Sequence, residues 1–319
     1  MSGAPMDIAR IAREALMLDG GGLRTERVPG ATLYVRDGAA YGAEIPYVCV
    51  IGAFDGLHLG HRALIDAARA ECEARSLPLA LVTFVPDPSE VLSKRNPRHL
   101  SSDDDRVRSL SLVDPDLIIA FDFTWDFSRN SYETFTLDIL GSIVKPVSIH
   151  VGEDFTFGAD GAGSPSDISR LGLSHGFTAH GHALVRKDGD AISSTRIRRL
   201  LEEGDLDEVR ALLGRCHMMR ASITSGRQGD LFTFDGRSCM PASGDYACII
   251  AIDGFATPCI VRFDSASCSA AVVAPETFPH HDATCSVIFI RLLSESDDSF
   301  SRMWVEQDKI QLEIGEVGA

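Results

Sequence analysis

The sequence lacks any apolar run long enough to cross a membrane as a helix, which needs about 20 residues. It also lacks a basic start followed by a short apolar segment, the pattern of a secretory signal. These absences predict a cytoplasmic protein with no membrane association. Basic residues are scarce, because 30 Lys and Arg stand against 46 Asp and Glu, for a formal net charge of −16. The charge argues against non-specific nucleic-acid binding, which needs basic surface to neutralise phosphates.

Paired cysteines are absent as well. The eight cysteines are scattered without any Cys-x-x-Cys, which excludes a zinc ribbon and a redox motif and predicts reduced, mostly buried thiols. His280, His281 and Cys285 bring three candidate metal ligands close together, but no fourth ligand has a recognisable spacing. The sequence therefore names no protein ligand for a metal.

The residues that are present are typical of a globular protein with two domains. Apolar residues make up 45% of the 319 residues and charged residues 24%, and this length can bury one substantial core and a smaller one. We predict an N-terminal extension at residues 1–25 with a short amphipathic helix at 6–18, an α/β domain at 26–214, and a β domain at 215–319.

The α/β domain is predicted to be a Rossmann-like parallel sheet with helices on both faces. Continuous apolar runs indicate strands that are buried on both sides, and amphipathic runs between them indicate helices. An extended segment is expected at residues 28–41, with a turn at Asp37–Gly38. The predicted strands are residues 47–51, 77–85, 117–123 and 147–151, and the predicted helices are 61–75, 103–112, 132–140, one opening within 192–201, and 206–213. Ligands of such a sheet bind at the carboxyl ends of its strands.

The stretch GAFDGLHLGH, residues 52–61, joins the first core strand to the first long helix. Free backbone N–H groups and the helix dipole favour an anion at such a junction. His58 and His61 can both donate hydrogen bonds to oxygens that gain negative charge during displacement at phosphorus, and Gly60 lets the backbone approach a phosphate. A turn with two incidental histidines is the alternative. The surrounding glycines and Asp55 favour the functional interpretation.

A second motif, VGEDFTFG at residues 151–158, follows the strand at 147–151. Phe155 and Phe157 can stack on a flat ring system, and Asp154 can accept hydrogen bonds beside it. Two core phenylalanines are the alternative. The glycines from 158 to 163 are expected to form a mobile loop over the site.

A third motif, ISSTRIRRLL at residues 192–201, opens a helix. Capping explains Ser193, Ser194 and Thr195. It does not explain Arg196 and Arg198 near the positive end of the helix dipole, where a cation is disfavoured by several tenths of a kcal/mol. A bound polyphosphate would offset that cost, although solvated surface arginines are the ordinary alternative.

Together with VTFVPDP at residues 82–88, these stretches resemble in order the motifs of the His-x-Gly-His nucleotidyltransferases, and in detail those of bacterial FAD synthetases, the bifunctional riboflavin kinase/FMN adenylyltransferases. The resemblance implies a nucleotidyltransferase domain that transfers AMP from Mg²⁺-bound ATP to the substrate FMN, giving FAD and pyrophosphate. It implies catalytic roles for His58, His61 and Arg196, and flavin contacts from Asp154, Phe155 and Phe157. The implied nucleotide contacts are Gly52, Ala53, Phe54, Gly56, Gly60, Ser193, Ser194, Thr195 and Arg196. The chain departs from the family at Ala53, where Asn or Val is usual, and at Thr156 and Gly161, where arginines are common.

Beyond Gly214, short β-type runs separated by turn residues predict a small antiparallel barrel, which the resemblance implies is a kinase barrel. These runs are residues 221–224, 246–252, 257–263, 270–273 and 286–293. The Gly-Phe-Pro-Thr-Ala-Asn segment of such kinases is missing between Gly226 and Met240, and the glutamate expected on a late strand is missing from 285–293. We therefore predict that riboflavin kinase activity has been lost and that the barrel is a contact surface for a protein partner or a second copy.

Two alternative functions stay open at this point. The chain could adenylylate or cytidylylate a different small phosphate ester, since His-x-Gly-His motifs serve several acceptors. It could instead be a catalytically silent protein that binds flavin or nucleotide.

Overall fold

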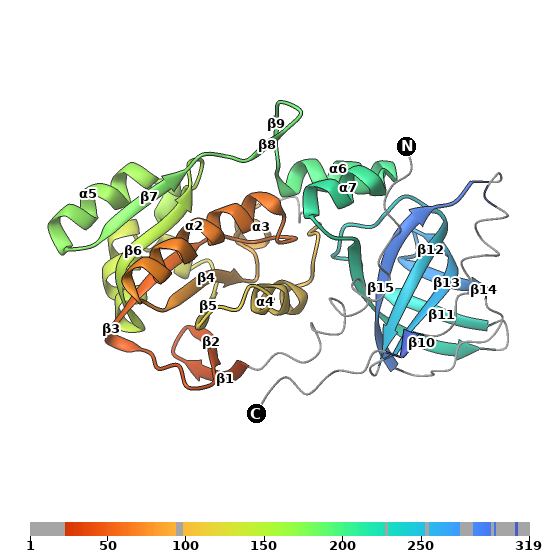
Figure 1. The fold of residues 1–319 in the computed structure, drawn as a ribbon, viewed down its shortest axis with the longest axis horizontal. Helices are drawn as coiled ribbons and strands as arrows, with labels where there is room; N and C mark the ends of the chain where they lie inside the picture. Colours follow the sequence, from red (N-terminus) through yellow and green to blue (C-terminus); the bar gives the residue numbers. More distant parts are fainter. Residues whose placement is uncertain are drawn as a thin grey trace. The chain divides into compact units, whose positions relative to one another are not determined.

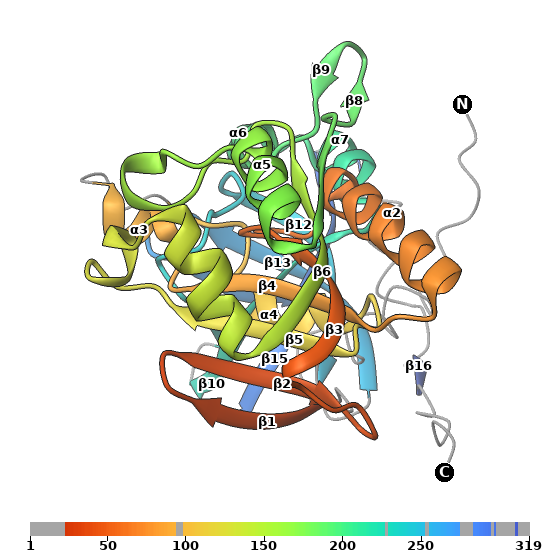
Figure 2. The same ribbon diagram turned by 90° about the vertical axis from the view of Figure 1, so that its left-hand side faces the viewer.

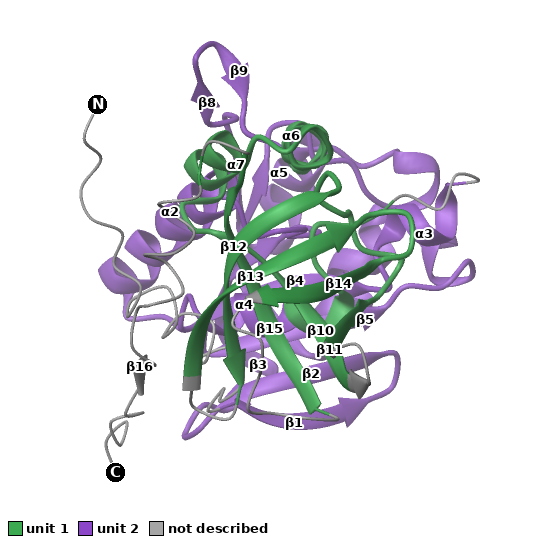
Figure 3. Ribbon diagram, turned by 90° about the vertical axis from the view of Figure 1, so that its right-hand side faces the viewer, with its two compact units in different colours: residues 1–20, 98–105, 194–319 green, residues 21–97, 106–193 purple. Residues whose placement is uncertain are grey.

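The structure is a computed structural model, which describes residues 23–93, 98–226, 229–252, 255–274, 283–294, 297 and 310–311. The predicted helix at 6–18 and the residues His280 and His281 lie outside the described residues. The chain divides into two compact units (Figure 3), which we call the α/β unit, residues 21–97 and 106–193, and the barrel unit, residues 98–105 and the chain from 194 onward. The units divide at 193/194, ahead of Gly214, and the sequence domains 26–214 and 215–319 stay a prediction.

The α/β unit is built on one seven-stranded sheet with the order β1-β2-β5-β4-β3-β6-β7 (Figures 1 and 2). Strands β5, β4, β3, β6 and β7 are parallel, and β1 and β2 form an antiparallel hairpin on the β5 edge. The strands are β1 Leu23–Val28, β2 Ala31–Arg36, β3 Gly42–Ile51, β4 Leu79–Val85, β5 Leu117–Asp122, β6 Val144–Gly152 and β7 Thr178–His182, with a separate hairpin of β8 Arg186–Lys187 and β9 Asp190–Ala191. The predicted Rossmann-like sheet is confirmed.

Helices cover both faces of this sheet, and α2 and α5 lie on opposite sides of it (Figure 2). The α-helices that begin in or cross this unit are α2 Leu59–Arg75, α3 Pro88–Leu92, α4 Asp103–Ser111 and α5 Pro165–His175. Shorter helical turns are 3₁₀ turns at Phe127–Arg129, Leu140–Ser142 and Ala159–Gly161, and a π-helix at Thr134–Ile139. No helix of the described residues is both long and apolar enough to cross a membrane.

The central strands are buried on both faces because their alternate residues enter two separate cores. In β3, Val48 and Val50 pack with Leu64 and Ile65 of α2, and we call this the α2 face. Their neighbours Tyr47, Cys49 and Ile51 pack on the other side with Phe135, Ile168 and Phe177, and we call this the α5 face. A strand with two apolar faces reads as a continuous apolar run, which is why these strands could be predicted.

Four elements of the α/β unit differ from the sequence prediction. Residues 28–41 do not form one extended segment, because the chain reverses at Gly30 and β2 pairs along β5. Helix α5 and strand β7 were not predicted at all. The predicted helix at 132–140 exists as a π-helix followed by a 3₁₀ turn.

The barrel unit holds six strands that close on themselves in the order β12-β15-β10-β11-β14-β13, with β13 pairing back to β12 and β16 pairing to β13. Its elements are α6 Ser194–Glu203, α7 Leu206–Leu213, β10 His217–Gly226, β11 Gly229–Phe234, β12 Gly244–Ile252, β13 Phe255–Asp264, β14 Ser269–Ala274, β15 Ala283–Leu292 and β16 Ile310–Gln311. Aromatic rings fill the interior, where Phe263 and Phe289 lie 5.8 Å apart between centroids and Tyr246 meets both edge-on. The predicted antiparallel barrel is confirmed, although the sequence missed strand β11.

Candidate functional site

The stretch from Gly52 to His58 is a turn between the end of β3 at Ile51 and the start of α2 at Leu59, as predicted. Phe54 is fully buried and anchors the turn, with its ring edge-on to the His61 ring at 5.3 Å. His58 caps α2, because its Nδ1 accepts a hydrogen bond from the backbone N–H of His61 at 3.3 Å. The two imidazole rings stack with centroids 3.7 Å apart. The turn thus holds both histidines together at the positive end of a helix dipole.

Both imidazoles are neutral near pH 7. Burial lowers the pKa of His58 to about 4, and burial together with the His58 charge lowers the pKa of His61 well below its usual value. Since Nδ1 of His58 accepts a hydrogen bond, the proton of the neutral ring is assigned to Nε2, which is then a donor. The Nδ1 atom of His61 is buried and has no hydrogen-bond partner among the described residues. The pair can therefore act through hydrogen bonds rather than as cations.

A side chain at Gly60 would be crowded by its neighbours. A Cβ built on Gly60 would lie 3.1 Å from atoms of the His58 ring and 3.3 Å from the carbonyl oxygen of Ile192. The segment that ends at Ser193 therefore runs directly against the histidine turn. Its position is fixed by the hydrogen bond from the Ile192 N–H to the carbonyl of Val185 at 2.8 Å.

A pocket of about 1000 Å³ opens beside the turn within the α/β unit, lined by Ala53 of the turn, by residues 84–92 after β4, by residues 123–135 after β5, and by residues 154–161 after β6. The predicted flavin residues Asp154, Phe155 and Phe157 all line this pocket. The Phe155 and Phe157 rings stack on each other at 5.3 Å, and Phe157 also packs edge-on against Phe135 at 5.8 Å. Phe157 therefore belongs to the core as well as to the pocket, as the alternative interpretation of the motif expected.

The loop at residues 158–162 is closed at its base, because Phe157 and Gly163 exchange two backbone hydrogen bonds of 3.1 and 2.9 Å. Gly158 has φ +74°, and a Cβ there would lie 2.6 Å from the backbone nitrogen of Tyr132. Close packing on Tyr132 thus requires glycine at this position. That the loop moves stays a prediction.

A buried ion pair between Arg106 and Asp87 stabilises one wall of the pocket. Arg106 of α4 donates to Asp87 at 3.0 Å and to the carbonyl oxygen of Phe84 at 2.8 Å, and its side chain is only 1% exposed. Asp87 also accepts the backbone N–H of Ser89 at 2.9 Å, which caps α3. These bonds fix the chain that follows β4 at the pocket wall. The sequence analysis placed Asp87 at this strand end but did not identify Arg106.

The remaining predicted residues, Ser194, Thr195 and Arg196, form the first turn of α6 in the barrel unit. Arg196 makes an ion pair of 3.0 Å with Glu208 of α7, and both side chains are mostly buried. The sequence analysis treated a bound polyphosphate as the anion that would offset the cost of Arg196 at this helix start. The protein itself supplies that anion, so the dipole argument no longer requires a ligand.

Several pocket residues could not be found from a motif. Trp125, Phe127, Arg129 and Asn130 line the pocket from the loop after β5. This loop lies outside the four motifs. The only available signal was the local density of aromatic residues, which stand at every second position in Phe121, Phe123, Trp125 and Phe127. Arg129 is the notable addition, because it is an exposed cation at the pocket wall.

A parallel sheet with a His-x-x-His turn at a strand end and a pocket beside that turn is typical of α/β domains that bind nucleotides. The family model described as FAD synthetase matches residues 43–196. Over these residues the chain matches the FAD synthetase family, and the resemblance seen in the sequence is confirmed.

Relatives of this chain with the name bifunctional riboflavin kinase/FMN adenylyltransferase include one from Listeria monocytogenes and one from Escherichia coli. The one from Listeria monocytogenes is 32% identical over 196 residues, which cover 57% of this chain and 58% of the relative. The one from Escherichia coli is 29% identical over 180 residues, 56% of this chain and 58% of the relative. The matched region thus spans less than two thirds of these relatives.

A crystal structure of a protein named macrolide-efflux protein, from Streptococcus pneumoniae, has a similar fold. Its TM-score is 0.67 at 23% identity, and the match covers 82% of this chain and 99% of that one. At this identity the likeness shows a shared fold across both units and nothing further.

Proposed function

We propose that this chain is an FMN adenylyltransferase, which transfers AMP from ATP to FMN and releases FAD and pyrophosphate. The observation that carries the proposal is the pocket of about 1000 Å³, because it gathers residues from three of the family motifs around one cavity. A volume of this size is at the upper end for small-molecule sites. It can hold a tricyclic ring system with a phosphorylated side chain.

The aromatic lining suits the isoalloxazine ring of FMN. Flat ligands gain from stacking on aromatic faces, and Trp125, Phe127 and Phe155 offer such faces at the pocket wall. Asp154, which is exposed at the same wall, is a hydrogen-bond acceptor for the ring or the ribityl hydroxyls.

A cation at the same wall supports FMN rather than riboflavin as the acceptor. Arginines that are common in the family are replaced here by Thr156 and Gly161, and both of these residues line the pocket. Arg129, on the loop after β5, offers a guanidinium at the wall in their place. Guanidinium binds phosphate through paired, charge-assisted hydrogen bonds. We therefore assign the FMN phosphate to Arg129.

In the proposed reaction, an oxygen of the FMN phosphate attacks the α-phosphorus of ATP, and the bond from that phosphorus to the β-bridging oxygen breaks. Magnesium enters with ATP as part of the substrate and shields its phosphates. The Nε2–H of His58 and a ring N–H of His61 donate to oxygens that gain charge in the transition state, and donors of this kind need no proton transfer of their own. The neutral state of both rings at pH 7 is compatible with this role.

Gly52, Ala53, Phe54, Gly56 and Gly60 are proposed to shape the turn around the nucleotide, and Ser193, Ser194, Thr195 and Arg196 to bind the β- and γ-phosphates. The closeness of Ile192 to Gly60 supports the part of this assignment that concerns Ser193. Arg196 would have to share its guanidinium between a phosphate and Glu208.

We further propose that the barrel unit has lost riboflavin kinase activity. The described residues between Gly226 and Met240 include strand β11 and the turn after it, and the sequence of this stretch contains no Gly-Phe-Pro-Thr-Ala-Asn segment. The relatives named above are bifunctional, and their matched regions cover little more than half of this chain. The FMN for the proposed reaction would then come from a separate kinase.

Product analysis tests both parts of the proposal. The purified full chain is incubated with Mg-ATP and either FMN or riboflavin, and the flavins are separated by chromatography. The expected result is FAD and pyrophosphate from FMN, and no FMN from riboflavin. His61→Ala is the inactive comparison, and His175→Ala, at the exposed end of α5, is the matched control with full activity.

Each other outcome identifies a different function. FMN formed from riboflavin disproves the loss of kinase activity. Binding of FMN and ATP without pyrophosphate release identifies a silent binding protein. Pyrophosphate release with another phosphate ester, but not with FMN, identifies a transferase of different specificity.

A further inference from the structure

A polar cluster interrupts the apolar α2 face of the sheet. On this face β3 and β4 present Val48, Val50, Leu79 and Leu81 to the helix. The next strands along the sheet, β6 and β7, present Ser148 and His150, and His180 and His182, at alternate positions. Ser148 and His150 are almost fully buried, at 0% and 3% exposure. Polar side chains at core positions are retained where they are fully paired or serve a function.

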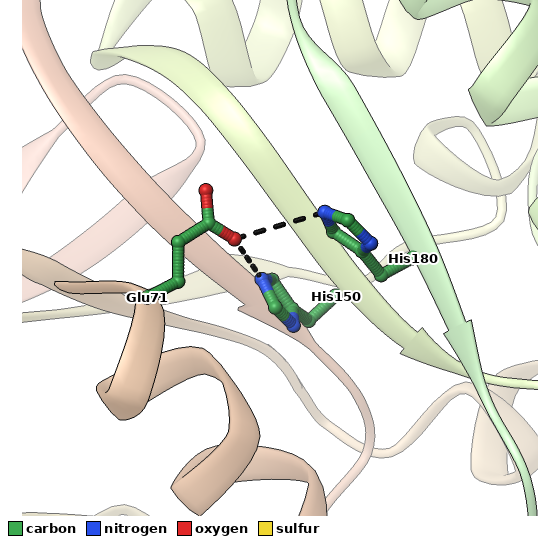
Figure 4. Close-up of side chains that lie close together, drawn as sticks. All are labelled: Glu71, His150 and His180. Atoms are coloured by element: carbon green, nitrogen blue, oxygen red, sulfur yellow. Dashed lines mark hydrogen bonds and ion pairs between the residues drawn. The ribbon is translucent and has the colours of Figure 1, made fainter. Parts of the chain in front are cut away.

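Glu71 of α2 is the centre of this cluster (Figure 4). Its Oε2 atom lies 2.8 Å from Nε2 of His150 and 3.7 Å from Nε2 of His180. Both ring nitrogens face this one carboxylate oxygen in the figure, and they come from neighbouring strands in register. The three ligand atoms lie within 4.8 Å of one another. Two imidazoles and a carboxylate that converge in this way are the donor set of many zinc sites.

We propose that Glu71, His150 and His180 bind a divalent transition-metal cation of the Zn²⁺ class. This site lies outside the proposed transferase function and does not rest on it. Bonds of about 2.0–2.1 Å from a tetrahedral ion place its ligand atoms roughly 3.3 Å apart, and the two distances to Glu71 fall on either side of that value. The His180 side chain is 47% exposed, which leaves one side of the ion open to water as a fourth ligand.

Polar neighbours hold both carboxylate oxygens of Glu71 in place. Arg75 pairs with the Oε1 atom of Glu71, and the Ser148 hydroxyl donates to Oε2 at 2.9 Å. An ion bound at Oε2 would share that oxygen with Ser148 and would take the place of the hydrogen bond from His150.

His182 supplies the outer contact that metal-bound histidines commonly have. Its Nε2 lies 2.9 Å from Nδ1 of His150. When the cation binds Nε2 of His150, the proton of that ring moves to Nδ1 and is donated to His182. Such a bond fixes the tautomer and the ring orientation of the ligand. His182 is therefore a positioning residue and not a ligand.

A cation at this place would join the last turns of α2 to β6 and to β7, which is the edge strand of the sheet. Without the ion, the same residues form a hydrogen-bonded cluster in which His150 donates to Glu71 and accepts from His182. The two states differ in the tautomers of both His150 and His182, because the hydrogen bond between these rings reverses its direction. The affinity of the cluster for a metal can be measured.

The test uses the full chain, purified without a histidine tag and dialysed against a chelator. Zn²⁺ alone is titrated by calorimetry in the absence of nucleotide, and Co²⁺ is titrated by visible absorption, which reports coordination number. We expect one ion in a site with nitrogen and oxygen ligands. His180→Ala and Glu71→Gln should each weaken binding by at least about tenfold, as the loss of an outer contact alone costs 10–100-fold. His175→Ala, which removes an exposed histidine at the end of α5, should change nothing.

Thermal unfolding provides a second measurement, because an ion bound only by the folded chain raises its melting temperature. Zn²⁺ should raise the melting temperature of the wild type more than that of His180→Ala. The proposal is overturned if the wild type takes up no Zn²⁺, or if both cluster variants bind it as tightly as the wild type does. Neither readout depends on FAD formation, so a failed metal test and a failed transferase test are distinguishable.

Discussion

Replacing Trp125 tests whether the pocket of the α/β unit binds the flavin. Trp125 lines the pocket and is 62% exposed, so the indole contributes little to the core and its removal should change stability by less than about 0.5 kcal/mol. Stacking of a flat ring on an aromatic side chain is worth about 1–3 kcal/mol by alanine substitution. Trp125→Ala should therefore raise the Kd for FMN by about fivefold to 150-fold.

The assay is calorimetric titration with FMN, repeated by the quenching of flavin fluorescence. Leu173→Ala is the matched control, because Leu173 is 88% exposed on α5 and does not line the pocket. Phe155→Ala would be less informative, since Phe155 packs on Phe157 and its loss disturbs the core. A folded Trp125→Ala protein that binds FMN within twofold of the wild type would remove the flavin from this pocket.

Three further predictions concern the histidine turn and its support. His61→Ala should lower turnover by about 10²–10³-fold, the cost of one transition-state donor, with a smaller change in ATP affinity; a near-normal steady-state rate would exclude His61 from the mechanism. Arg106→Met should lower the unfolding free energy by about 3 kcal/mol in urea titration, because it leaves Asp87 buried without its cation, whereas Arg199→Met at an exposed pair should change it by less than about 0.5 kcal/mol. Stability should also fall as the pH drops from 6.5 towards 4, because the unfolded chain protonates His58 first and the folded chain resists protonation until its pKa of about 4. The loss amounts to about 3 kcal/mol, and unfolding curves for His58→Asn should be flatter across this range than those of the wild type.

The parts of the fold that could be predicted are those whose signal is local. Strands β3, β4 and β5 are continuous apolar runs because each buries two faces, and the turn after β3 is marked by its glycines. Strand β7 was missed for the opposite reason. It carries His180 and His182 instead of apolar residues on its α2 face, so its sequence has no apolar pattern. The strand is defined by its hydrogen-bonded pairing with β6, which the local sequence does not reveal.

The candidate site likewise has a part that the local sequence predicts and a part that it does not. His58 and His61 lie three residues apart, and the chemistry of their turn could be read directly from the chain. The contacts that complete the pocket join residues that are distant in sequence. Arg106 meets Asp87 across 19 positions, and Trp125 belongs to a loop outside the four motifs. The ion pair of Arg196 could not be foreseen for the same reason, because Glu208 is 12 residues away on the next helix.

Strand β6 carries His150 of the proposed metal site and leads into residues 154–161 of the pocket wall, and its alternation keeps the two sites on different faces of the sheet. Ile149 and Val151 point to the α5 face, where the pocket lies, and Ser148 and His150 point to the α2 face, where Glu71 lies. A cation bound by His150 would therefore make no contact with a flavin in the pocket. FMN affinity should therefore be the same in the presence and absence of Zn²⁺. Because coupling between two sites is reciprocal, Zn²⁺ affinity should then also be the same with and without FMN. Direct competition between the two ligands would mean that one of them binds on the other face of the sheet, and it would refute one of the two assignments.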